Sequence, residues 1–141
     1  MADRRGVRAA LPRPGAAAGR GKKRLTALAG WHFGGGAAYC RGCAAHKRQC
    51  AEGRLGAGGE LCPYLAHEPA TDAGWAAWDT LLRCAGQLRI AAGGIVIGLD
   101  LQAAIILGSH LGYGPIALAE LLPAAEAGLI RALHDRFNHH S

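Results

Sequence analysis

The segment Trp75–Asp100 constrains the fold most, because two consecutive glycines interrupt an amphipathic stretch there. Apolar side chains recur in it at three- and four-residue steps, which predicts one buried face of a helix. They are Trp75, Trp78, Leu81, Leu82, Ala85 and Leu88. Gly93 and Gly94 are expected to end this helix, because glycine enters left-handed backbone conformations without steric cost. Since the segment holds two of the three tryptophans, we expect it to nucleate the core.

The pattern from Thr71 to Phe137 is helical, which predicts a mainly α fold with a small three- to four-helix domain at about residues 72–137. The expected helices are Asp72–Ile90, Leu101–Leu111, Ile116–Leu122 and Pro123–Phe137. Thr71 or Asp72 is expected to cap the first helix, and Asp100 the second. Pro115 suits the first position of a helix, whereas Pro123 either kinks a helix or begins one. Residues 95–97 fit a short strand or a loop.

Residues outside this domain differ from it in composition. Residues 1–30 hold eight Lys or Arg and one Asp, and so carry +7. The whole chain carries +6, so residues 31–141 sum to −1. Residues 1–30 are expected to form a disordered basic arm, which can bind phosphates or simply remain solvated. The remaining expected units are a Cys/His-rich segment at 31–70, the helical domain at 71–138 and a frayed tail at 139–141.

The Cys/His-rich segment contains Cys40, Cys43, Cys50 and Cys62, with the spacing CxxC-x6-C-x11-C. A CxxC turn can place two thiolates on one zinc ion, and two downstream ligands would complete a tetrahedral structural site. This zinc knuckle would leave no open position for catalysis. Free thiols, disulfides and redox chemistry remain alternatives. Cys84 lies beside the apolar face of the first helix and is expected to be a small core residue.

Gln87, Arg89 and Asp100 lie around the glycine break. Arg89 and Asp100 could pair across it and so brace the loop between two helices. Contact with a partner protein is one alternative for this group, together with Trp75 and Trp78, and simple exposure of the three side chains is the other.

Several functional classes are not expected. The uncharged run Leu101–Ala119 approaches the length of a membrane span, but its polar, glycine and proline residues favour a buried helical hairpin. No targeting segment is recognised, which favours the cytoplasm. Because no nucleophile or acid–base set can be assembled, we do not expect an enzyme.

The region Trp75–Leu133 resembles a phage-related family of unknown function encoded in the tail-gene clusters of tailed phages and prophages. The matching features are Trp78, the run Gln87-Leu88-Arg89, where the family usually has Gln-Trp-Arg, and the glycine run that ends in Gly98-Leu99-Asp100. Members lie where the frameshifted downstream half of a tail assembly chaperone is expected. The resemblance implies a non-enzymatic helper in the bacterial host cytoplasm, which binds tail-tube or tape-measure protein during assembly. The alternative function is a zinc-knuckle adaptor that binds nucleic acid through its basic arm.

Overall fold

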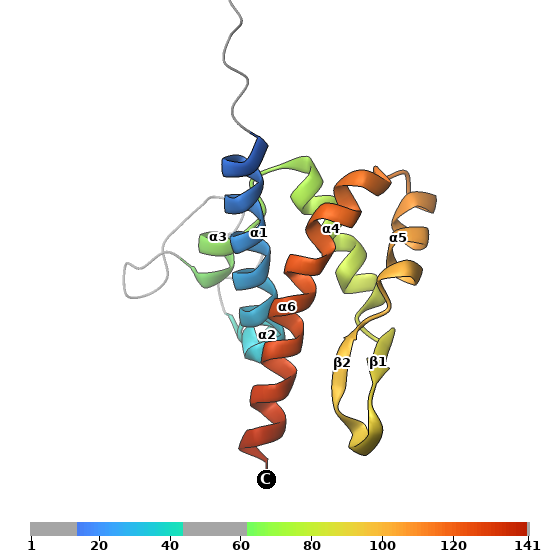
Figure 1. Ribbon diagram of the computed structural model, residues 1–141. Coiled ribbons are helices and arrows are strands. Elements are labelled where there is room, and N and C mark those ends of the chain that lie inside the picture. Colours follow the sequence, from blue (N-terminus) through green and yellow to red (C-terminus); the bar gives the residue numbers. More distant parts are fainter. Residues whose placement is uncertain (1–13, 44–61, 141) are drawn as a thin grey trace, which may run out of the picture.

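The computed structural model of the chain describes residues 14–43 and 62–140, which form a small, mainly helical domain (Figure 1). Its elements are α1 (Pro14–Trp31), the π-helical segment η1 (His32–Gly36), α2 (Ala37–Gly42), α3 (Pro63–His67), α4 (Asp72–Cys84), β1 (Leu88–Ile90), the 3₁₀ turn η2 (Ala92–Gly94), β2 (Val96–Leu99), α5 (Leu101–His110) and α6 (Pro115–His139). No helix within these described ranges is long and apolar enough to cross a membrane.

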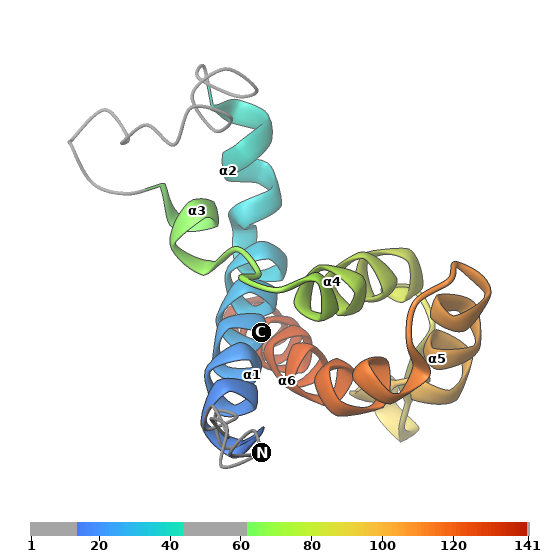
Figure 2. The ribbon, with the colours of Figure 1, turned by 90° about the horizontal axis from the view of Figure 1, so that it is seen from above.

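The long helix α6 organises the domain. It packs most extensively against α1, and it also contacts α4, α5 and β2. Seen from above, α1 lies along one side of α6 while α4 and α5 extend on the other (Figure 2). The fully buried large side chains come from α1, α4, β2 and α6, so one core joins them all; they are Leu25, Leu28, Leu81, Leu99, Leu118, Leu122, Leu129 and Thr80.

The expectation that residues 1–30 form a disordered arm is wrong for residues 14–30, which belong to α1. Leu25, Leu28 and Ala29 of this helix are buried against α6. Their spacing of three and four residues forms a narrow apolar stripe, but the surrounding lysines, arginines and glycines obscure it in the sequence. Residues 1–13 lie outside the described part of the chain.

The first helix of the predicted domain, α4, begins as expected and ends early. The Thr71 hydroxyl accepts a hydrogen bond from the Gly74 amide at 3.0 Å, so Thr71 is the N-cap. The helix ends at Cys84, six residues before the predicted end at Ile90. The reason is tertiary: Leu88 pairs with Leu99 in a β-hairpin, a contact that the local helical pattern cannot indicate.

The glycine pair forms the tip of this hairpin. Gly93 and Gly94 have φ angles of +83° and +80°, a left-handed conformation that glycine adopts without strain. The two strands pair antiparallel, with Arg89 opposite Gly98 and an irregular register between Arg89 and Ile90. Of the two alternatives for residues 95–97, the structure therefore favours the strand, which begins at Val96.

The C-terminal half agrees with the sequence patterns, except at Pro123. The Asp100 carboxylate accepts a hydrogen bond from the Ala103 amide at 3.0 Å and caps α5, as predicted. Pro115 occupies the first turn of α6, also as predicted. The two expected helices 116–122 and 123–137 are one continuous helix with Pro123 inside it. Pro123 lies on the exposed side, where water can hydrate the Ala119 carbonyl that lost its amide partner.

Candidate functional site

Three of the four predicted zinc ligands lie close to the two ends of the undescribed residues 44–61. Cys40 is in the last turn of α2, Cys43 follows that helix, and Cys62 caps α3. All three are half-buried, while Cys50 lies outside the described residues. Within residues 14–43 and 62–140 no three Cys, His, Asp or Glu side chains are grouped to hold a metal ion. The four-cysteine zinc site therefore stays a prediction.

An aromatic cluster positions the helices that carry these cysteines. The Trp31 ring centroid lies 6.1 Å from that of Tyr39 on α2 and 6.3 Å from that of Tyr64 on α3. Gly36 lies under the Trp31 indole, where an added Cβ would come within 2.5 Å of the ring. Trp31 therefore holds α2 and α3 against the end of α1 by aromatic packing.

The next residue, His32, connects this cluster to the core. Its ring contacts Phe33 and Trp78 edge-on, with centroid distances of 4.9 Å and 5.2 Å. Burial lowers the pKa of His32 below its usual value, and the nearby charge of Arg41 acts in the same direction. The packing of its ring between Phe33 and Trp78 gives His32 a structural role.

The two tryptophans predicted on one buried face have different environments. Trp78 is only 3% exposed and lies in the core, as predicted, whereas Trp75 is 40% exposed. Leu82 is also 40% exposed, so the buried stripe is narrower than the sequence pattern indicates. The Cys84 side chain is buried as expected, and burial raises the pKa of its thiol.

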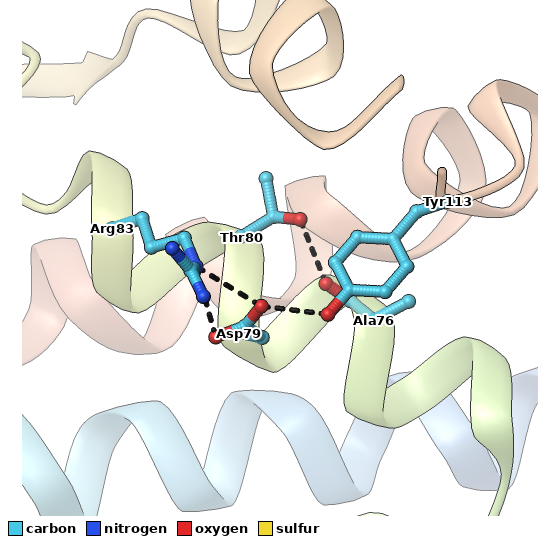
Figure 3. A network of polar contacts seen from close by, with 5 residues as sticks. All are labelled: Ala76, Asp79, Thr80, Arg83 and Tyr113. Atoms are coloured by element: carbon cyan, nitrogen blue, oxygen red, sulfur yellow. Dashed lines mark hydrogen bonds and ion pairs between the residues drawn. The ribbon is translucent and has the colours of Figure 1, made fainter. Parts of the chain in front are cut away.

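A polar network on α4 was not predicted from the sequence (Figure 3). Tyr113, in the turn before α6, donates its hydroxyl hydrogen bond to Asp79 Oδ2 at 2.6 Å. The Arg83 Nε donates to both carboxylate oxygens of Asp79 at 3.1 Å. The Tyr113 bond lowers the pKa of Asp79, and the same bond raises the pKa of Tyr113. Because its partners occupy the carboxylate, Asp79 acts as a brace between α4 and the turn before α6.

The predicted pair of Arg89 and Asp100 does not form. Both residues are described, and no ion pair joins them, because the Asp100 carboxylate instead caps α5. The Arg89 side chain lies over Gly98, where an added Cβ would be 2.8 Å from its Nη2. Gln87 joins the two strands at the base of the hairpin through its backbone, since its carbonyl accepts a hydrogen bond from the Asp100 amide at 2.8 Å.

Glu126 on α6 performs the bracing role that was expected of Arg89 and Asp100. Its Oε2 accepts a hydrogen bond from the Leu99 amide of β2 at 2.7 Å. Farther along α6, His134 Nε2 lies 2.8 Å from the Val96 carbonyl oxygen. The sequence signal for Glu126 is weak: it is one acidic residue beside the apolar positions of a long helix.

The hairpin and the end of α6 present large apolar side chains to solvent. Ile90, Ile95 and Ile97 are 60%, 50% and 52% exposed, and Phe137 is 62% exposed. Ile95 and Phe137 line one groove of about 280 Å³ between the hairpin tip and α6. We call these four residues the hairpin surface. Apolar side chains that share one groove, as Ile95 and Phe137 do, mark interaction sites more often than scattered ones do.

Further hollows lie along α1, and two of them have a distinct chemical character. One, of about 560 Å³, is mostly apolar and lies between α1, residues 69–74 and the start of α6. Another, of about 370 Å³, is open and basic, because Arg20, Lys23, Arg24 and His67 line it.

Comparison with known proteins gives one partial match. Residues 90–141 match the model of a family of unknown function, DUF7697. The matched part begins at the end of β1 and comprises the hairpin tip, β2, α5 and α6. No curated protein and no solved structure matches the chain. The family description names no function and does not connect the chain to phage tail genes.

Proposed function

We propose that this protein is a non-enzymatic assembly helper that acts by protein–protein contact, in the manner of a tail assembly chaperone of a tailed phage or prophage. Its partner would be tail-tube or tape-measure protein in the host cytoplasm. The sequence resemblance over residues 75–133 supports the phage context.

The hairpin surface is the structural observation that carries the binding role. Ile95 and Phe137 leave about half or more of their surface in water although the domain has a formed core. They also share a groove, which gives a partner side chain a concave apolar site. The residues that line this groove all lie in the part of the chain that matches the DUF7697 family model.

Co-expression with each candidate partner tests the proposal. The full chain would be produced with the tail-tube protein or the tape-measure protein encoded in the same genome, and complexes would be isolated by size. We expect a complex with one of the two tail proteins. The double change Ile95→Ser and Phe137→Ser should lower its affinity at least about tenfold, as truncation of a central apolar anchor does.

Ile116→Ser provides the matched control. Ile116 is 83% exposed at the opposite end of α6, so its loss removes apolar surface without touching the groove. A complex that the control weakens equally would contradict the role of the hairpin surface. Failure of both tail proteins to bind, with no tail genes beside this one, would contradict the proposed function.

A second candidate function is nucleic-acid binding through α1. The basic hollow is its specific observation: Arg20, Lys23 and Arg24 lie on one exposed side of the helix and face His67 of α3. Such a surface binds phosphates without sequence preference. Replacing these three residues with Gln should reduce the slope of log K against log salt by up to about 2.7 for duplex DNA. Arg131→Gln, on the second half of α6, should change it much less.

A further inference from the structure

The two outer edges of the β-hairpin have different environments. In the ladder, Gln87 pairs with Asp100, Arg89 with Gly98 and Ala91 with Ile95. In an antiparallel pair, alternate residues direct their backbone groups to the partner strand and the others direct them away. The N–H and C=O groups of Leu88 and Ile90 therefore point to the outer edge of β1.

Side chains of α6 cover the outer edge of β2. Glu126 accepts the outward N–H of Leu99, and His134 contacts the outward carbonyl of Val96. Figure 1 shows β2 on the side next to α6 and β1 on the outside. The outward backbone groups of Leu99 and Val96 thus have hydrogen-bond partners in a carboxylate and an imidazole of α6.

The outer edge of β1 has no such cover from the described residues. No hydrogen bond in the described part of the chain reaches the outward backbone groups of Leu88 or Ile90. Arg89 and Ile90 are exposed, and Ile90 is 60% accessible. An uncovered strand edge is a template for another strand, and a two-stranded sheet gains stability when a third is added.

The charge of Arg89 indicates which strand fits. A second copy that used both outward residues would place Arg89 opposite the same arginine, in the close, non-hydrogen-bonded position. Like charges directly opposite one another destabilise a sheet, so self-pairing is disfavoured. Arg89 forms no ion pair in the described chain. Glu126 lies near it across Gly98, but its carboxylate accepts a hydrogen bond from the Leu99 amide. An acidic residue on an added strand would therefore give Arg89 an ion-pair partner.

We propose that the outer edge of β1 binds an extended segment of the partner protein as a third, antiparallel strand, with an acidic residue opposite Arg89 and apolar residues on either side. The backbone of Leu88 and Ile90 supplies the hydrogen bonds, and Arg89 supplies the selectivity. The proposal rests on the proposed function in that the partner is a protein.

Two synthetic peptides test the edge directly. One has the core Val-Glu-Val and the other Val-Lys-Val, both with blocked ends, and each is titrated into the full-length protein labelled with ¹⁵N. The Glu peptide should shift the amide signals of Leu88 and Ile90 and slow their hydrogen exchange. The Lys peptide should bind at least about fivefold more weakly, because the opposite and like charge pairs both contribute. Unchanged Leu88 and Ile90 signals, or equal binding of the two peptides, would overturn the proposal.

Variants separate the edge from the rest of the hairpin. Ile90→Pro removes an outward N–H but no ladder bond, a position at which edge strands tolerate proline. It should weaken the binding of the Glu peptide by about tenfold. Ile90→Thr keeps the N–H and favours strands, so this variant should retain binding. Arg89→Gln keeps the whole backbone, so it provides the test if the proline variant loses the hairpin. It should make the two peptides bind equally, and a persisting preference for Glu would contradict the role of Arg89.

The same variants distinguish this inference from the proposed function. If the Glu peptide binds β1 but neither tail protein forms a complex, the edge is a binding site and the phage role fails. If a tail protein binds and Ile90→Pro leaves that complex intact while the groove variants disrupt it, the phage role stands and the third strand does not.

Discussion

Thr26 on α1 donates its hydroxyl hydrogen bond to the carbonyl oxygen of Ala124 on α6, with an oxygen–oxygen distance of 2.8 Å. One turn farther along α6, Gly128 lies against the backbone of α1. A Cβ added at Gly128 would meet the Thr26 carbonyl oxygen and would come within 2.8 Å of the Gly30 nitrogen. The two helices therefore touch backbone to backbone, which is how α1 becomes part of the core.

Gly128→Ala should destabilise the protein because the added methyl has no space at this contact. Forcing extra atoms into a packed site costs about 1–3 kcal/mol. That cost should exceed the gain of about 1 kcal/mol that alanine brings inside a helix. Urea unfolding measures the difference. Gly19→Ala on α1 is the control: nothing lies within 4 Å of its added Cβ, so it should be neutral or stabilising.

Trp78→Ala should be among the most damaging single changes. Trp78 is 3% exposed and contacts both His32 and Phe33, so its loss leaves a cavity where α4 meets η1. Truncation of a buried tryptophan costs about 3–5 kcal/mol. Thermal unfolding should show a midpoint many degrees lower, or no cooperative transition. Trp75→Ala is the matched control, and a comparable loss there would contradict the difference in burial.

The contact between Tyr113 and Asp79 should make stability depend on pH at both extremes. Its hydrogen bond lowers the pKa of Asp79, so this stabilisation is present above the unfolded value of about 3.9 and is lost as pH falls through the folded-state pKa. The raised pKa of Tyr113 gives stabilisation that is present below about 10 and is lost as pH rises through its folded-state pKa.

Tyr113→Phe should therefore lower the urea midpoint at pH 7. The midpoint of this variant should also fall less steeply as pH is lowered into the acid range or raised into the alkaline range. Asp135→Asn, which removes an exposed carboxylate on α6, should leave both declines unchanged. If the phenylalanine variant keeps the full acid and alkaline declines, Asp79 and Tyr113 do not interact in solution.

Local signals predicted the parts of the fold that depend on neighbouring residues. Thr71, Asp100 and Pro115 occupy the helix starts that they predict, because capping depends on the residues within one turn. The predicted end of α4 was wrong, because strand pairing of Leu88 with Leu99 outweighs a continuing helical pattern. The role of α1 could not be predicted, since it depends on Gly128, about a hundred residues away in sequence.

The candidate site was less predictable for the same reason. The sequence pattern singled out Gln87, Arg89 and Asp100, and the structure places all three at the base of the hairpin. However, the predicted ion pair between Arg89 and Asp100 was wrong, because the Asp100 carboxylate caps the helix that follows. The partner that holds the hairpin is Glu126, which only the tertiary fold brings to β2.

The prediction of a structural zinc ion can be tested with cobalt. Cys40, Cys43, Cys50 and Cys62 should bind Co²⁺ with the strong visible bands of tetrahedral thiolate coordination, and Cys43→Ser should remove them. His46 in place of Cys50 would also satisfy the spacing. Cys84→Ser is the control, because this cysteine is buried in the core. Protein purified without chelator that holds less than about a tenth of an equivalent of zinc, with five titratable thiols, would exclude the site.

Glu126→Ala should loosen the hairpin from α6. Its carboxylate accepts the outward Leu99 amide at 2.7 Å, and loss of a hydrogen bond to a charged group costs about 1.5–3 kcal/mol. The effect should be local, because β2 contacts α6 at one edge: Leu99 should lose protection from hydrogen exchange, while amides of α1 keep theirs. Glu126→Gln retains an acceptor and should restore part of the protection.

Glu120→Ala is the matched control for this change. Glu120 lies on the same helix and forms an exposed ion pair with Lys22 at 2.9 Å, which should contribute less than about 1 kcal/mol. If Glu126→Ala costs no more than Glu120→Ala, and Leu99 exchanges at the same rate in both variants, then Glu126 does not hold the hairpin. The hairpin would then depend on the buried Leu99 side chain and on the contact of His134 with the Val96 carbonyl.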